Sequence, residues 1–263
     1  MAVVSGVRSG IGRAIVLKLS DQGASVVAWD LDGDAGRELV DEIRSRQGYA
    51  AHLLVDVADS KAVVTAAAET CRRFGKIDLL VNNSGAGTSA ATLLSTRDSD
   101  WRGVLQANLD AAFFCLRAVA PRMLERRYGR IVNICSSGAT PGLGGQAAHW
   151  TAKAGLQGLT VVAARELGPF GITVNAVAPG LIRTDARELL LRGEYAAGRG
   201  NFVSRIGEPA EVAGLVGFLS SPSCSYITGE VIRVDGGWGQ VGDTDDLVPE
   251  LRGEGKRPPT EGG

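Results

Sequence analysis

The segment Ser5-Gly6-Val7-Arg8-Ser9-Gly10-Ile11-Gly12 is the strongest indication of the fold class in this sequence. A short apolar run, Ala2–Val4, precedes it, and the segment after it carries Ile11, Ile15 and Leu19 at helical spacing. Gly23 follows this segment and supplies a left-handed stop. The pattern predicts a strand, a glycine turn and a helix, which together begin a βαβ unit.

Seven apolar runs of strand length alternate with helix-length amphipathic segments along the chain. This alternation is typical of parallel strands joined by crossover helices, and the near-continuous apolar character predicts strands covered on both faces. We therefore expect an α/β fold, namely a single-domain, Rossmann-type, doubly wound, seven-stranded parallel sheet with helices on both faces. The expected strands are Ala2–Val4, Ser25–Trp29, Ala51–Val55, Ile77–Val81, Arg130–Ile134, Thr173–Val177 and Val231–Val234.

Two long helices are predicted in the second half of the chain. The first is Trp101–Arg127, ended by Pro121 or by Gly129, and the second is Ala147–Leu167, ended by Gly168-Pro169. Helices of this length often form subunit contacts, so we expect a homo-oligomer, either a dimer or a tetramer.

Length and charge narrow the class of protein further. The 263 residues suit one domain, residues 1–238, and the Gly-, Pro- and acid-rich residues 239–263 are expected to be a disordered tail. A net charge of −1 with scattered Lys and Arg argues against nucleic acid or a membrane surface as partner. No apolar run reaches the roughly 20 residues of a membrane span and no signal-peptide pattern is present, so we expect a cytoplasmic protein.

The cysteines and histidines lack the spacing of metal ligands. We therefore expect no metal site, reduced thiols in the core and a structural role for His52.

The glycine turn has the make-up of a dinucleotide site. Glycines allow a tight turn and a close backbone approach, so that a pyrophosphate meets free N–H groups at the positive end of the helix. Asp30 lies eighteen positions after Gly12, where a carboxylate accepts from ribose hydroxyls and repels a 2′-phosphate. This favours NAD over NADP, although the Arg8 guanidinium could pair with a 2′-phosphate. The alternative is that Asp30 is an exposed loop residue beside a helix cap at Asp32 or Asp34.

Further motifs follow in order: Asp56-Val57, Asn82-Asn83-Ser84-Gly85, Asn108, Pro179-Gly180-Leu181-Ile182-Arg183-Thr184 and Val234-Asp235-Gly236-Gly237. Together with the glycine turn they resemble the short-chain dehydrogenase/reductase family, from Met1 to about Trp238. The resemblance implies that Asp56 and Val57 hold the adenine and that Ile182 and Thr184 contact the carboxamide. The residues expected to bind the cofactor are Gly6, Arg8, Ser9, Ile11, Gly12, Asp30, Asp56, Val57, Asn83, Gly85, Lys153, Pro179, Gly180, Ile182 and Thr184.

The catalytic pattern of that family is a Ser, a Tyr and a Lys four residues after the Tyr, with an Asn upstream. Asn108, Ser136 and Lys153 match it, but His149 stands at the Tyr position, thirteen residues after Ser136. Tyr49, Tyr128 and Tyr226 are remote from this position in the pattern. Tyr195 falls in residues 185–209, which by resemblance form a lid over the substrate. From there it could supply a phenol from another direction, although the preferred interpretation is a packing residue on a lid helix.

Histidine changes the proton chemistry that the resemblance implies. The family's Lys lowers a phenol pKa from about 10 toward neutral, whereas an imidazole has a reference pKa of about 6.5 and a neighbouring cation disfavours its charged form. A neutral imidazole accepts a proton from an alcohol but is a poor acid for ketone reduction. It is also shorter than a phenol. Lys153 keeps its implied role of bonding the nicotinamide ribose, and Trp150 is interpreted as a packing or subunit-contact residue.

Three functions stay open on this evidence. The first is an NAD(P)-dependent oxidoreductase acting on a secondary alcohol or ketone, with His149 as an adapted acid and base. The second is a non-redox dehydratase, isomerase or cyclase that keeps the dinucleotide site, which the unusual residue alone would place in specialised-metabolite biosynthesis. The third is a non-catalytic dinucleotide-binding protein. Each would take a small molecule as partner, and the sequence leaves that molecule's identity open.

Overall fold

The computed structural model describes residues 1–8, 10–87, 91–142, 144–184 and 201–238. A seven-stranded parallel sheet forms its centre, in the order β3-β2-β1-β4-β5-β6-β7. The strands are β1 (Ala2–Ser5), β2 (Val26–Asp30), β3 (Ala50–Leu54), β4 (Leu79–Asn82), β5 (Gly129–Ile134), β6 (Ile172–Pro179) and β7 (Val231–Val234). The predicted fold class is confirmed, and each strand begins within two residues of its predicted start.

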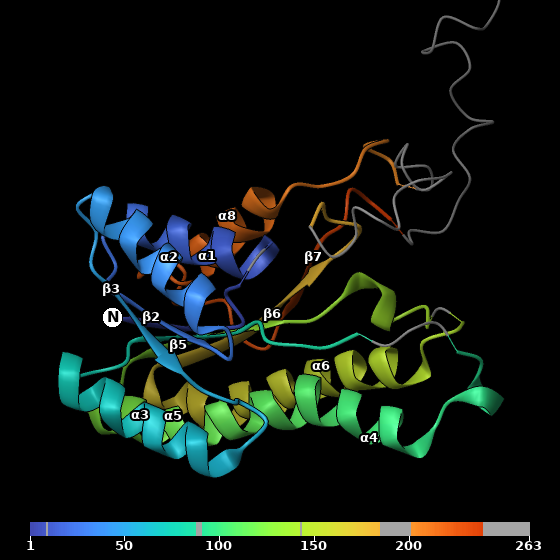
Figure 1. The fold of residues 1–263 in the computed structure, drawn as a ribbon, viewed down its shortest axis with the longest axis horizontal. Helices are drawn as coiled ribbons and strands as arrows, with labels where there is room; N and C mark the ends of the chain where they lie inside the picture. The colour runs from blue at the N-terminus through green and yellow to red at the C-terminus, as the bar shows by residue number, and fades with distance from the viewer. Residues whose placement is uncertain (9, 88–90, 143, 185–200, 239–263) are drawn as a thin grey trace, which may run out of the picture.

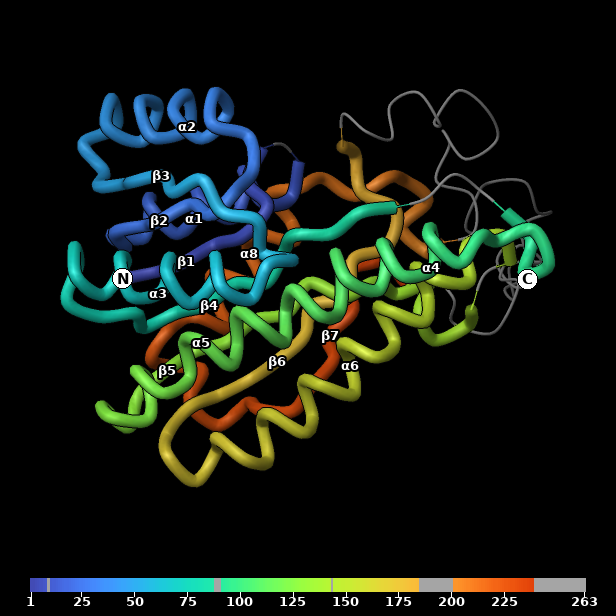
Figure 2. The backbone as a smooth tube through the Cα atoms, turned by 60° about the horizontal axis from the view of Figure 1, so that its bottom comes forward, coloured from blue at the N-terminus to red at the C-terminus, as the bar shows by residue number. Residues whose placement is uncertain are grey.

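Helices cover both faces of this sheet (Figure 1). One face carries α1 (Gly10–Asp21), α2 (Gly33–Ser45) and α8 (Pro209–Leu219), and the other carries α3 (Ser60–Phe74), α4 (Asp98–Leu105), α5 (Ala111–Arg126) and α6 (Ala147–Leu167). Short helical turns are Leu93–Ser95, Ser137–Ala139 and Gly168–Phe170. Figure 2 shows α2 beside β2 and β3 at one end of the sheet and α6 beside β6 and β7 at the other.

The apolar patterning of the sequence explains these two layers. Ile15, Val16 and Leu19 of α1 pack with the inner residues of α2 and α8 on one face, and their exposure is at most 3%. On the other face α3, α5 and α6 bury a second cluster around Trp29 and Met123. Burial of apolar surface on both sides is the main stabilising term for such a sheet. Gly23 takes φ +83° after α1, as its position predicted.

The prediction of one continuous helix over Trp101–Arg127 is wrong, and of the two ends predicted for it the structure has the later one, just before Gly129, and not Pro121. The helical segment is interrupted by a π-helical turn, η2 (Gln106–Asp110), where the Ala111 N–H donates to the Gln106 carbonyl. Pro121 lies inside α5 and does not end it. Arg127 ends the helix with φ +50°, and its N–H returns to Leu124 and Met123 carbonyls. The second predicted helix, α6, has the bounds that the sequence indicated.

The reversal of strand order lies between β1 and β4, because β1 pairs with β2 on one side and with β4 on the other. Loops at the carboxyl ends of these two strands therefore diverge and leave a crevice, as in doubly wound sheets generally. The glycine turn follows β1 and Asn83 follows β4, so the topology brings two separate motifs to this crevice.

Candidate functional site

The glycine turn is held in a shape that larger residues cannot take. Gly6 and Gly10 have φ of +71° and +59°, in the left-handed region that disfavours other side chains. A Cβ on Gly6 would lie 2.7 Å from the Ser84 Cα, and one on Gly12 would lie 1.9 Å from the Gly6 carbonyl oxygen. Helix α1 begins at Gly10, so its first N–H groups face the crevice. Ser9 lies outside the described residues.

Asp30 ties this turn to the end of β2. Its carboxylate accepts from the N–H groups of Val7 at 2.6 Å and Arg8 at 3.1 Å, and from that of Asp32 at 3.0 Å. Capping of α2 belongs to Asp32, which accepts from the N–H groups of the helix's first turn. The helix cap named in the alternative is thus present at Asp32, whereas Asp30 is itself half-buried at the end of β2 and lines the crevice.

Asn83 joins the turn to the loop after β4. Its side-chain amide donates to the Gly6 carbonyl at 2.6 Å, and its backbone N–H donates to the Ser5 hydroxyl at 3.1 Å. Ser84 donates to the same hydroxyl at 3.2 Å. Ser5 was not among the predicted site residues, although its place directly before the first glycine is a signal that could have found it.

The crevice is a cleft of about 420 Å³ at the carboxyl ends of the strands. The predicted residues that line it are Gly6, Arg8, Ile11, Gly12, Asp30, Asp56, Val57, Asn83, Gly85 and Thr184. Leu31, Val55, Ala58, Ser84, Ala86 and Ala107 also line it and were not predicted. Most of these are neighbours of predicted residues, whereas Ala107 comes from the π turn, which has no signature in the sequence.

Asn108 and Lys153 converge on Gly85 at one side of the cleft. A Cβ on Gly85 would lie 2.5 Å from the Asn108 Oδ1 and 3.5 Å from the Lys153 Nζ. The Asn108 amide donates to the Ala86 carbonyl at 2.7 Å. Its Oδ1 is buried and has no hydrogen-bond partner among the described residues, which leaves an acceptor at the wall of the cleft.

Lys153 is buried beneath this wall. It is 6% exposed, its Nζ donates to the Ile134 carbonyl at 2.9 Å, and burial lowers the pKa of its ammonium. The nearby Cys135 thiol opposes that shift, and burial raises the pKa of Cys135 itself to about 12. A lysine held in this way still has donor N–H bonds to offer to a group in the cleft.

Ser136 and His149 lie at the starts of two neighbouring elements. Ser136 follows β5 in an extended conformation, and its hydroxyl makes no capping bond to the turn Ser137–Ala139. His149 is the third residue of α6, is half-buried, and has its ring 4.8 Å from that of Trp150 in an edge-to-face arrangement. The three tyrosines that the structure describes lie elsewhere: Tyr49 precedes β3, Tyr128 precedes β5 and Tyr226 is fully exposed. Tyr195 lies outside the described residues.

Of the predicted cofactor-binding residues after β6, Thr184 lines the cleft, and the others make contacts within the protein. Pro179 ends β6, and Gly180 donates to the Val234 carbonyl at 3.0 Å. Ile182 is 3% exposed, bridges to Gly207 and does not line the cleft. Thr184 reaches Gly10, since a Cβ there would lie 2.8 Å from the threonine methyl. Of residues 185–209, the structure describes 201–209 only.

The residues present fit a nicotinamide dinucleotide. The glycine turn forms a cradle that Cβ atoms would fill, and the buried Asn108 Oδ1, an acceptor with no partner among the described residues, lies behind Gly85 of the cleft wall. No group of three or more His, Cys, Asp or Glu suited to a metal ion occurs among the described residues. Within those residues no helix is long and apolar enough to cross a membrane. The four cysteines are free thiols, three of them buried.

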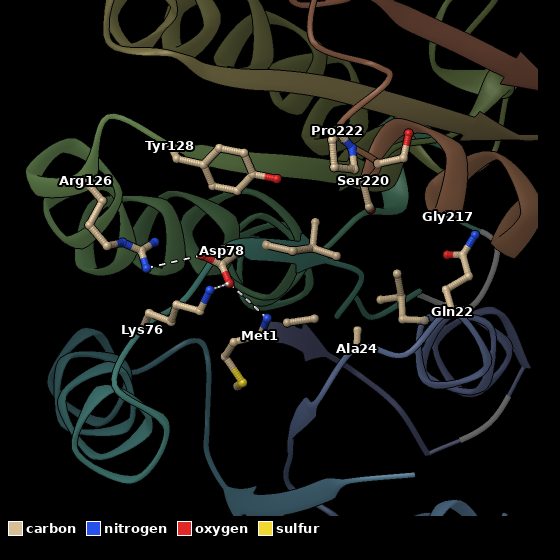
Figure 3. Close-up of a pocket in the computed structure, with 14 residues that line it drawn as sticks. Met1, Gln22, Ala24, Lys76, Asp78, Arg126, Tyr128, Gly217, Ser220 and Pro222 are labelled. Atoms are coloured by element: carbon tan, nitrogen blue, oxygen red, sulfur yellow. Dashed lines mark hydrogen bonds and ion pairs between the residues drawn. The ribbon is translucent and has the colours of Figure 1, made fainter.

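A second cavity, of about 680 Å³, lies at the amino ends of the central strands β1 and β4 and holds none of the predicted site residues (Figure 3). Its cations surround one carboxylate: the Asp78 oxygens lie 3.0 Å from the Met1 amino group, 3.0 Å from Lys76 and 3.2 Å from Arg126. Burial alone would raise the pKa of Asp78, but the hydrogen bonds from Lys76 and the amino group hold that pKa below its ordinary value. All three cations of this cavity therefore contact the same carboxylate.

Comparison with known proteins identifies the family of the chain. A family model described as Enoyl-(Acyl carrier protein) reductase matches residues 6–239. A 3-oxoacyl-[acyl-carrier-protein] reductase of Synechocystis sp. is 40% identical over 241 residues, which cover 90% of this chain and 96% of the relative. The (2S)-[(R)-hydroxy(phenyl)methyl]succinyl-CoA dehydrogenase subunit BbsD of Thauera aromatica is 38% identical, with 90% and 95% covered.

A solved structure gives the same result for the fold. The crystal structure of gox2181 matches with a TM-score of 0.87 and 32% identity, over 90% of this chain and 94% of that one. The family model, the relatives and the shared fold lead to the same family. The chain belongs to the short-chain dehydrogenase/reductase family of NAD(P)-dependent oxidoreductases.

Proposed function

We propose that the protein is an NAD-dependent oxidoreductase that interconverts a secondary alcohol and a ketone. The observation that carries the proposal is the convergence of Asn108 and Lys153 at Gly85, beside a cleft shaped for a dinucleotide. The relatives' names support the substrate class, since a 3-oxoacyl group contains a ketone and a hydroxy(phenyl)methyl group a secondary alcohol.

Asp30 supports NAD over NADP. Its carboxylate lines the cleft beside the turn, where it would accept from ribose hydroxyls and repel a 2′-phosphate. Arg8 lines the same cleft and is exposed, so it is the one described cation there that could offset this repulsion. We expect NAD to bind more tightly than NADP by at least about tenfold, which corresponds to about 1.4 kcal/mol.

Each polar residue has a role in this proposal. When bound, NAD would accept a hydride from the alcohol, and NADH would donate one to the ketone. Lys153 donates a hydrogen bond to the nicotinamide ribose, and Asn108 holds a water through its free acceptor atom. Ser136 orients the substrate oxygen, and the imidazole of His149 takes the proton from the alcohol or returns it to the ketone oxygen.

The experiment is a spectrophotometric assay of nicotinamide oxidation and reduction, with NAD and NADP, against a panel of secondary alcohols and ketones. We expect turnover with NAD for the wild type and a loss of at least about a hundredfold in kcat for Lys153→Ala. Failure of hydride transfer across the panel, while calorimetry detects bound dinucleotide, contradicts the proposal.

The imidazole at position 149 favours a second candidate, a non-redox dehydratase, isomerase or cyclase that retains the dinucleotide. A neutral imidazole moves protons near neutral pH without the acid strength that ketone reduction asks of its donor. Substrate consumption with no change in nicotinamide absorbance distinguishes this candidate. In that case His149→Tyr, which restores the family's phenol, is expected to gain reductase activity.

A further inference from the structure

Trp150 connects two parts of the site that are distant in sequence. The indole packs against the turn Ser137–Ala139, which directly follows Ser136. A Cβ on Gly138 would lie 2.6 Å from the indole Cη2 and 2.6 Å from its Cζ3. Any side chain at Gly138 would therefore overlap the indole, and the glycine lets the ring lie directly on the backbone of the turn.

The same indole contacts the ring of His149. The two ring centroids are 4.8 Å apart and the ring planes meet at 75°, which is the edge-to-face geometry that aromatic rings prefer. Adjacent residues of a helix point about 100° apart, so this contact requires both side chains to bend toward each other. The indole Nε1 is buried without a hydrogen-bond partner among the described residues, so packing rather than a polar bond holds the ring.

We propose that Trp150 is the positioning residue for His149: clamped on the Gly138 turn, its indole holds the imidazole in one orientation relative to Ser136. An imidazole is shorter than the phenol it replaces and has two torsions that can misdirect it. A rigid neighbour that contacts both the ring and the serine turn fixes those torsions before substrate enters. The role of this orientation in proton transfer rests on the proposed function, whereas the orientation itself does not.

The chain offers a clean probe of this contact, because it contains two histidines only, His52 and His149. The first experiment records ¹H–¹³C spectra of histidine labelled at Cε1, over a pH titration, for wild type, Trp150→Phe and Trp150→Leu. His52 lies on β3 against Gly36 and serves as the internal control. We expect the His149 resonance to move and broaden in Trp150→Leu, to move less in Trp150→Phe, and the His52 resonance to stay.

Gly138→Ala provides a second approach that leaves the tryptophan in place. The added methyl displaces the indole, so the His149 resonance is expected to move as in Trp150→Leu. Gly144→Ala is the matched control, since a Cβ there meets no atom within 4 Å. An unchanged His149 resonance in both Trp150→Leu and Gly138→Ala overturns the proposal, even if the enzyme is active.

The kinetic readout separates positioning from folding. We expect Trp150→Leu to lower kcat by about tenfold or more, to leave the KM for the dinucleotide within twofold, and Trp150→Phe to recover part of kcat. Trp150 does not line the dinucleotide cleft, so a loss of cofactor affinity would indicate general damage. A wild-type kcat in Trp150→Leu overturns the positioning role. Absence of hydride transfer in the wild type, with the spectral changes present, contradicts the proposed function and leaves the orientation by Trp150 supported.

Discussion

Single polar side chains hold the glycine turn in place from the loops around it. Asp30 binds three backbone N–H groups, and Asn83 binds the carbonyl of Gly6. A dinucleotide that enters the cleft therefore meets a turn whose conformation is already fixed, and less of its binding energy is lost in ordering protein.

Asp30→Ala tests this tether. Removal of the carboxylate leaves the Val7 and Arg8 N–H groups without their charged acceptor, and bonds of this kind contribute about 1.5–3 kcal/mol each. We expect NAD affinity to fall at least about tenfold in calorimetry, with a larger loss for NAD than for NADP. Asp34→Ala is the control, because it removes the same charge from an exposed position. Equal affinity of the two variants for NAD contradicts the tether.

The cysteine beside Lys153 is predicted to be inert. Burial raises the pKa of the Cys135 thiol to about 12, and burial raises that of Cys115 to about 12 as well. At pH 8 both thiols stay protonated, and the thiolate is the form that reacts with iodoacetamide. Mass spectrometry after native alkylation is expected to find them unmodified, with half-buried Cys71 modified first and all four modified in denaturant. Native labelling of Cys135 as fast as that of Cys71 would contradict this.

The sequence predicted most elements because their signals are local. Seven apolar runs gave seven strands, and Gly168-Pro169 ended α6 where expected. The failures are places where tertiary structure overrides a local rule. Pro121 sits inside α5, because a proline costs a helix one hydrogen bond that packing of its buried neighbours outweighs. The π turn and the contact of Trp150 with Gly138 have no local signature, since each depends on how separate segments meet.

Two glycines inside helices allow the effect of core packing on stability to be measured separately from the effect of helix propensity. A Cβ on Gly36 of α2 would lie 2.2 Å from the ring of His52, whereas one on Gly158 of α6 meets nothing within 4 Å. We expect Gly36→Ala to destabilise the fold by about 1–3 kcal/mol through overpacking. Gly158→Ala should instead stabilise it by about 0.5–1 kcal/mol through helix propensity. Denaturant unfolding measures the change in the free energy of unfolding for both variants, provided that their m-values equal that of the wild type. A Gly36→Ala variant as stable as Gly158→Ala contradicts the packing argument.

The outer faces of α5 and α6 carry apolar side chains. Phe113, Val161 and Val162 are 40%, 44% and 53% exposed, and Arg117 lies over the Phe113 ring. We propose that a second copy of the chain covers these faces, which is the homo-oligomer expected from helix length.

Light scattering coupled to gel filtration tests the oligomer. We expect a mass that is a multiple of the 27.4 kDa chain, and a shift toward the single chain for Val162→Glu, whose charge would be desolvated in such an interface. Thr65→Glu, on the exposed side of α3, adds the same charge elsewhere and is expected to leave the mass unchanged. A wild type that elutes as a single chain over the micromolar range contradicts the proposal.

The wide turn at η2 makes this part of the chain intolerant of deletion. A π turn contains one residue more than the α-helical turn it replaces, so the two flanking helices differ in rotational phase by about 100°. Loss of Ala107 would let α4 run into α5 without interruption, and it would swing the Asn108 amide off the Ala86 carbonyl and out of the wall of the cleft. We expect the helices to survive such a deletion while the Asn108 amide loses its place behind Gly85, so that titration of the variant with dinucleotide registers a change that circular dichroism misses.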